Sequence, residues 1–125
     1  MTIYERAAQI WSLLALSARN RQVLTYDIVG KLIGVPRQGL GRMLEPIQSY
    51  CLLNKLPPLS ILVVSEQTGM PGTGFIAAQD IPLTQLQVFT FDWLTHKTPS
   101  SEDLKKAATE LPSNGNPKAA EQVAS

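Results

Sequence analysis

The sequence predicts a mainly α-helical domain with a small β-hairpin and a disordered C-terminal tail, and three observations support this fold class. Apolar residues in the N-terminal half recur at steps of three and four, the period of helices that bury one face. Two short apolar runs flank a turn rich in glycine and proline, which is typical of a hairpin. Large apolar residues become rare after residue 97. The chain has 125 residues, enough for one core, so we expect one domain over residues 1–97 and a tail over residues 98–125.

The first helix is expected over residues 3–18. Its apolar stripe consists of Ile3, Ala7, Ile10 and Leu14, and is widened by Trp11 and Leu13. A polar stretch then ends this pattern before Thr25, which is a suitable N-cap for a second helix. Gly34 suits the left-handed residue that ends a helix, and Pro36 suits the first turn of the next one. We therefore expect the second helix to stop near Ile33 and the third to begin near Pro36.

The third helix carries Leu40, Met43 and Leu44 on one face, and Pro46 predicts a kink or a break with a fresh start. The run LSILVV, residues 59–64, and the run GFIAA, residues 74–78, predict the two strands of the hairpin. Asp80 and Pro82 are start signals for a last helix, expected from Leu83 to about Leu94. The composition of residues 98–125 predicts disorder, with at most a transient helical turn around residues 102–111.

Composition and charge exclude several classes of protein. The net charge of +1 excludes histone-like basicity. A single cysteine, Cys51, excludes an intramolecular disulfide, and the single His96 leaves no zinc-binding cluster. The pair Asp92 and His96 is expected on the surface of the last helix. The N-terminus lacks the features of a signal peptide, and the longest apolar runs are too short to span a bilayer. We expect a cytoplasmic protein with no membrane partner, no metal and no cofactor.

Three helices followed by a hairpin, with a short turn between the second and third helices, is the order of a winged helix-turn-helix. Between residues 19 and 55 the chain has six basic residues and two acidic ones, which gives a local charge of +4. Arg37, Gln38 and Arg42 fall at or near the start of the helix expected to contact DNA, where side chains reach phosphates and base edges. A solvated basic face is the alternative interpretation. Gly39 and Gly41 predict a close approach to another helix or to a ligand.

Several short motifs in this region resemble the DNA-binding domain of alkylguanine-DNA alkyltransferases and their alkyltransferase-like relatives. They are Thr25-Tyr26 at a helix start, Ile33-Gly34 and Pro36 in the turn, Leu40-Gly41 and Leu44 in the next helix, and the glycine-rich TGMPGTGF. The resemblance covers about residues 25–75. It implies a helix-turn-helix that enters the minor groove, with either Arg37 or Gln38 in the place of the arginine that replaces a flipped nucleotide.

The chain departs from this family at the alkyl acceptor. Where the family has Pro-Cys-His-Arg, this chain reads SILVV, residues 60–64. Cys51 lies on a different element and has no neighbouring His, Lys or Arg in sequence, so we expect a small core residue rather than a nucleophile. The TGMPGTG loop lacks the lysine of a phosphate-binding loop and is better explained as a wing, over Ser65 to Gly74.

The leading hypothesis is a non-enzymatic protein of bacterial or phage type that binds double-stranded DNA with a helix-turn-helix and a wing. We expect the DNA-contacting residues to be Thr25, Tyr26, Lys31, Arg37, Gln38 and Arg42. The alternative is a winged-helix adaptor or regulatory subunit that binds a protein partner or a second copy of itself. The basic cluster favours the first hypothesis, whereas the near-neutral net charge and the polar tail are compatible with the second.

Overall fold

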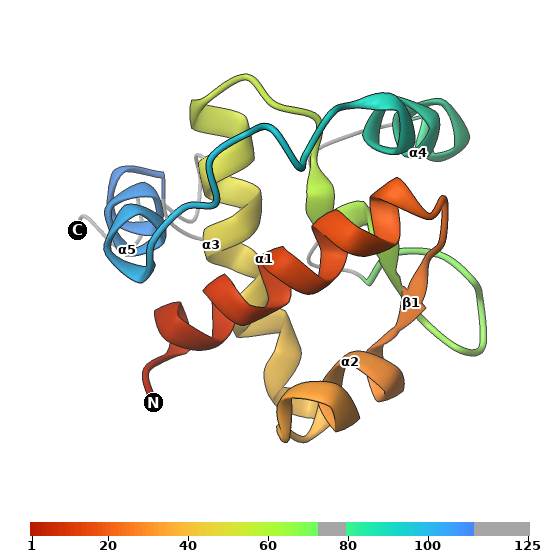
Figure 1. Cartoon of the computed structure of the whole chain (residues 1–125). Helices are drawn as coiled ribbons and strands as arrows, with labels where there is room; N and C mark the ends of the chain where they lie inside the picture. The colour runs from red at the N-terminus through yellow and green to blue at the C-terminus, as the bar shows by residue number, and fades with distance from the viewer. Residues whose placement is uncertain (73–79, 112–125) are drawn as a thin grey trace.

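The computed structural model describes residues 1–72 and 80–111, and this part of the chain is mainly helical (Figure 1). The elements in chain order are α1 (Ile3–Arg19), β1 (Leu24–Thr25), α2 (Tyr26–Ile33), the 3₁₀ helix η1 (Arg37–Gly39), α3 (Leu40–Leu53), the 3₁₀ helix η2 (Leu59–Leu62), β2 (Val63–Val64), α4 (Ile81–Thr90) and α5 (Ser101–Glu110). Within these residues, no helix is both long enough and apolar enough to cross a membrane.

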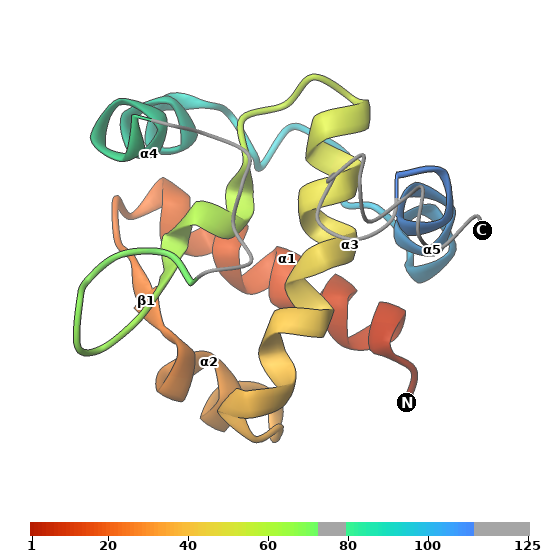
Figure 2. The ribbon, with the colours of Figure 1, turned by 180° about the vertical axis from the view of Figure 1, so that it is seen from behind.

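Helix α1 lies at the centre of the molecule and α3 crosses it. The two views in Figures 1 and 2 show α5 on one side of this pair and α4 on the other, with α2 at the end near the start of α3. The largest fully buried side chains include Trp11, Ile10 and Leu14 of α1, Leu40 and Ile47 of α3, and Leu104 of α5. The core is therefore formed where α1, α3 and α5 meet, and α2 lies at its edge.

The first two predicted helices are confirmed. Thr2 and Glu5 form a capping box at the start of α1, and the predicted stripe is buried at Ala7, Ile10 and Leu14. Thr25 caps α2 through its side-chain oxygen, which accepts a hydrogen bond from the Ile28 amide at 3.2 Å. Gly34 ends α2 with φ 75°, in the left-handed conformation predicted for it. The Arg6 guanidinium donates a hydrogen bond to the last carbonyl of α2, at Ile33, and so ties α2 to α1.

The close backbone approach is at Gly30 rather than at the predicted positions Gly39 and Gly41. A Cβ atom on Gly30 would lie 2.5 Å from the Val35 carbonyl oxygen, so α2 and the following turn pack directly on each other there. A Cβ on Gly41 would meet nothing within 4 Å, and one on Gly39 would make an ordinary contact with the Val35 side chain at 3.5 Å. The prediction of close packing by another helix at Gly39 and Gly41 is wrong.

The third predicted helix differs at its start and at Pro46. The residues after Pro36 form one 3₁₀ turn, η1, and the α-helix begins at Leu40. Of the two outcomes predicted at Pro46, a kink or a break, the break is wrong, because α3 continues through it from Leu40 to Leu53. A proline inside a helix leaves the carbonyl four residues before it without an amide partner. Pro46 is buried between neighbouring elements, and the packing of α3 against α1 and α5 offsets this loss.

The predicted hairpin is replaced, in the described residues, by a small parallel sheet. Residues 59–62 of LSILVV form the 3₁₀ helix η2, and the strand is limited to Val63–Val64. This strand pairs in parallel with Leu24–Thr25, in the register Leu24 to Val63 and Thr25 to Val64. Val64 also forms an antiparallel bridge with Pro71. The second predicted strand, residues 74–78, lies outside the described residues. A short sheet thus joins two segments that are far apart in the sequence.

The last two helices correct the predicted C-terminal end of the domain. Helix α4 begins as predicted after Asp80, whose side chain caps Leu83, but it ends at Thr90 instead of near Leu94. A further helix, α5, begins at Ser101 after the N-cap Ser100, which forms a capping box with Asp103, and it buries Leu104 and Ala107. The disorder predicted from residue 98 is therefore wrong as far as Leu111. A domain that ended at residue 97 would lack a helix that contributes to the core. Residues 112–125 lie outside the described part.

Candidate nucleic-acid interface

The beginning of α2, the turn η1 and the segment after β2 surround one pocket. Parallel pairing of Thr25 with Val64 means that Tyr26 and Ser65 leave the sheet at the same end. The side chains that follow the two strands therefore meet across a small gap, and η1 closes its third side. The pocket has a volume of about 300 Å³ and is lined by Tyr26, Arg37, Gln38, Ser65, Glu66 and Gln67.

The segment after β2 is a compact turn. The Ser65 amide donates to the Met70 carbonyl at 2.9 Å, and the Gly69 amide donates to the Ser65 carbonyl at 2.8 Å. Gly69 has φ 68°, a conformation that favours glycine, and the Ser65 hydroxyl accepts from the Gln67 amide at 3.2 Å. These bonds hold residues 65–72 beside α2, where the sequence predicts a wing; residues 73 and 74 of that predicted wing lie outside the described residues.

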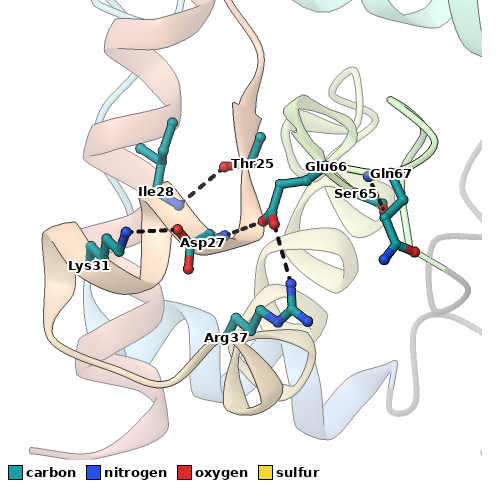
Figure 3. Close-up of polar contacts among 8 residues, drawn as sticks. All are labelled: Thr25, Asp27, Ile28, Lys31, Arg37, Ser65, Glu66 and Gln67. Atoms are coloured by element: carbon teal, nitrogen blue, oxygen red, sulfur yellow. Dashed lines mark hydrogen bonds and ion pairs between the residues drawn. The ribbon is translucent and has the colours of Figure 1, made fainter.

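The predicted cations on this surface are paired with carboxylates (Figure 3). Lys31 Nζ lies 2.9 Å from Asp27 Oδ2, and Arg37 Nη1 lies 3.3 Å from Glu66 Oε2. The hydrogen bond from Lys31 to Asp27 raises the pKa of the lysine. These are the two ion pairs found within residues 1–72 and 80–111. The four charges sum to zero, so the local excess of +4 predicted from the sequence is not found at this surface.

Glu66 makes a second contact on the same surface. Its Oε1 accepts a hydrogen bond from the Asp27 amide at 3.1 Å, so the carboxylate bridges the first turn of α2 and the Arg37 side chain (Figure 3). Both Arg37 and Glu66 are accessible to solvent, with side-chain exposures of 54% and 38%. The bridge is therefore an exposed contact that a ligand can reach.

Tyr26 forms the apolar wall of the pocket. Burial of its ring raises the pKa of the phenol, and a hydrogen bond with the Gly72 backbone acts in the opposite direction. A Cβ atom on Gly72 would collide with the Tyr26 hydroxyl group, so a larger residue at this position would force the Tyr26 side chain to move. Tyr26 is thus held as a neutral, partly buried hydrogen-bonding group at neutral pH.

Five of the six predicted DNA-contacting residues lie on this surface, and one does not. Tyr26, Arg37 and Gln38 line the pocket. Thr25 at the end of β1 and Lys31 on α2 lie beside it, and the Thr25 side-chain oxygen is occupied as the cap of α2. Arg42 lines a separate pocket of about 250 Å³ with Tyr4 and Glu45, and it makes no ion pair with any residue that the structure describes. Arg37 and Arg42 therefore do not share one pocket.

Ser65, Glu66 and Gln67 were not predicted as site residues. They follow a strand whose partner precedes Thr25, and this pairing across 39 residues leaves no local pattern in the sequence. The β-branched run LSILVV, bounded by turn residues, predicted a strand but not the strand with which it pairs. The sequence does not show which strand pairs with Val63–Val64. This pairing also brings Glu66 next to Arg37.

Cys51 and His96 lie elsewhere in the fold. Cys51 is fully buried in α3, as predicted for a core residue, and burial raises the pKa of its thiol to about 12. The prediction that Asp92 and His96 form a surface pair on a helix is wrong, because both follow the end of α4. Asp92 accepts from the Thr95 amide, whereas the half-buried His96 ring packs near Trp11 and Phe91. In the described part of the chain, no group of three His, Cys, Asp or Glu residues could hold a metal ion.

Comparisons with protein-family models, with curated protein sequences and with solved structures give no match to this chain.

Proposed function

We propose that this protein binds double-stranded DNA without catalysing a reaction, using the surface formed by the start of α2, η1 and residues 65–72. The observation that carries the proposal is the pocket in which Tyr26, Arg37 and Gln38 meet the turn after β2. On this proposal α2, the turn at Gly34 and α3 act as the helix-turn-helix, residues 65–72 act as part of the wing, and the protein works in the cytoplasm.

The exposed groups on this surface have the chemistry that DNA contacts require. Arg37 supplies a guanidinium group for a phosphate, and Gln38 supplies an amide that both donates and accepts. Tyr26 adds a phenol and a ring at the edge of the pocket. Arg42, which is exposed and lies on the first turns of α3, supplies a second cation that would contact the DNA phosphate backbone outside the pocket. The proposal therefore includes DNA contacts from two separate places on the surface.

The proposal keeps the likeness to alkyltransferase-like proteins and excludes alkyl transfer as the activity. An alkyl acceptor must be a reachable, ionisable nucleophile. Cys51 is buried, and its raised pKa keeps the thiol protonated at neutral pH. The Ser65 hydroxyl accepts a backbone hydrogen bond from Gln67, and no histidine lines the pocket. The groups present there suit binding rather than group transfer.

The salt dependence of binding to a labelled duplex tests this function. If Arg37 and Arg42 each contact a phosphate, replacing either with Ala flattens the log–log salt slope of the affinity by about 0.9. The double variant should lose about 2 units of slope. Fluorescence anisotropy between low and moderate salt measures both quantities. The matched control is Lys106→Ala on α5, which removes the same charge from an exposed position that lines neither the Tyr26 pocket nor the pocket of Arg42.

The control variant should keep the parent's affinity and slope. All variants should melt near the parent temperature, since substitutions of exposed side chains change stability by no more than about 0.5 kcal/mol. If Arg37→Ala and Arg42→Ala both bind duplex with the parent's slope, this surface does not bind DNA.

An adaptor function is the second candidate, and one observation favours it. Ile28 and Leu32, one turn apart on α2, are 45% and 61% exposed. Apolar side chains at this spacing on an outward face are typical of a helix that docks on a protein. In the same salt titration, an adaptor would show weak binding with a shallow slope in the parent and in all variants. The experiment thus separates the two functions.

A further inference from the structure

Glu66 occupies the place on this surface where an anion from outside would bind. Its two carboxylate oxygens make two separate contacts, one with the Asp27 amide at 3.1 Å and one with Arg37 Nη1 at 3.3 Å (Figure 3). A backbone amide at the beginning of a helix together with a guanidinium group is a combination that proteins use to bind phosphate. In this structure a carboxylate of the same chain takes both donors.

The position of Glu66 is set by the fold. The β1–β2 register directs the turn after β2 towards the start of α2, and the hydrogen bonds of residues 65–70 hold that turn closed. The Glu66 side chain itself is exposed and has rotatable bonds, so it can leave the two donors without any change in the backbone. An exposed ion pair of this kind contributes little, at most about a fivefold factor in an equilibrium.

We propose that Glu66 is an internal competitor of DNA phosphate, an autoinhibitory contact that must open before Arg37 can bind the duplex. The inference rests on the proposed function. Competition follows because Glu66 neutralises the charge of Arg37 that would attract the phosphate, and because a carboxylate left beside the phosphate would repel it. The contact therefore weakens binding to any duplex by the free energy needed to displace Glu66 from Arg37.

Glu66→Gln tests the competition with little change in shape. The amide oxygen of glutamine can still accept from Asp27, but the side chain no longer neutralises Arg37 or repels phosphate. We expect this variant to bind a labelled duplex at low salt about fivefold more tightly than the parent. In an Arg37→Ala background, the same substitution should have a clearly smaller effect, because only the repulsion between Glu66 and the phosphate is left to remove.

Glu110→Gln is the matched control. It removes the same charge from an exposed position at the end of α5, a helix that contributes no residue to the Tyr26 pocket. If the gain came from net charge alone, Glu110→Gln would show it too, and the proposal would be wrong. Thermal melting of each variant checks that the turn after β2 is intact.

The amide resonance of Asp27 gives a second readout in the parent protein. Opening of the contact by duplex DNA should shift this resonance, because its acceptor leaves, and Glu66→Gln should diminish the shift. If the parent binds DNA with a slope that depends on Arg37 while Glu66→Gln leaves both affinity and the Asp27 shift unchanged, the autoinhibitory contact is refuted and the DNA-binding function stands. If neither protein binds duplex at low salt, both proposals are refuted.

Discussion

Cys51 has no solvent-accessible surface, and burial raises the pKa of its thiol to about 12. At pH 8 a thiol with this pKa is ionised in about one molecule in ten thousand, so its reactivity is low even before access is considered. Sequence reasoning predicted this outcome correctly, because Cys51 lies in an apolar stretch without charged neighbours. Arg37 shows the opposite case, since its partner Glu66 comes from a distant segment that no local pattern identifies.

We predict that Cys51 is protected in the folded protein. A thiol reagent at pH 8 should label the native chain far more slowly than the chain in denaturant, and alkylated-guanine DNA should transfer no alkyl group to it. Mass spectrometry measures both. The same burial predicts a pH effect on stability: the folded pKa lies above the ordinary value of 9.0, so Cys51 stabilises the fold fully below pH 9.

This stabilisation is lost as the pH rises from about 9 towards 12, at up to about 1.4 kcal/mol per pH unit. The raised pKa values of Tyr26 and Tyr50 add to the loss in the same direction. Chemical denaturation of the parent and of Cys51→Ala at pH 8 and pH 10.5 separates the contributions, because the stability difference between the two proteins should shrink at the higher pH. A constant difference would show that the thiol ionises as easily in the folded chain as in the unfolded one.

At the scale of elements, local signals were reliable where a helix has one buried face. The structure confirms the predicted caps of α2, Thr25 and Gly34, and the predicted apolar stripe of α1. The strand predicted over residues 59–62 is wrong, and these residues form the 3₁₀ helix η2. Because η2 is buried at every position, its apolar run has no period that distinguishes a strand from a helix. A kink or break was predicted at Pro46 because helix propensity describes the proline alone and takes no account of the elements that pack on both sides of α3.

Helix α5 has a sparse apolar face, and this is why composition predicted disorder. Its buried residues are Leu104 and Ala107, one turn apart, and the rest of the helix is mainly charged or small. We predict that Leu104→Ala lowers the free energy of unfolding by about 2–4 kcal/mol, because it leaves a cavity between α5, α1 and α3. Chemical denaturation measures the change. The neighbouring exposed substitution Lys105→Ala should stay within about 0.5 kcal/mol, and an equally small effect of Leu104→Ala would mean that α5 is not part of the core.

At the scale of the whole molecule, the contacts that form the candidate site join segments far apart in the sequence, so no local pattern predicts them. Tyr26, Arg37 and Gln38 were predicted as site residues because they lie within one helix-turn-helix pattern. Their surroundings depend on the β1–β2 pairing and on the turn of residues 65–72, which join segments 39 residues apart. The predicted hairpin placed that turn beside a different strand. Half of the residues that line the pocket were therefore among those predicted from the sequence, whereas the pairing of Arg37 with Glu66 was not predicted.

The final prediction concerns a chain that ends at residue 97, the domain boundary that composition indicates. Removing α5 takes Leu104 and Ala107 out of the core and uncovers the faces of α1 and α3 on which they pack. A loss of several kcal/mol follows from the two buried side chains, and 1 kcal/mol shifts the melting temperature of a domain of this size by several degrees. We expect the shortened chain to melt at least about 10 °C below the full chain and to bind more of a dye that reports exposed apolar surface. Circular dichroism on heating and dye fluorescence measure the two effects. A shortened chain that melts within about 3 °C of the parent would show that α1, α2, α3 and the small sheet form a sufficient core without α5, as the composition of residues 98–125 suggests.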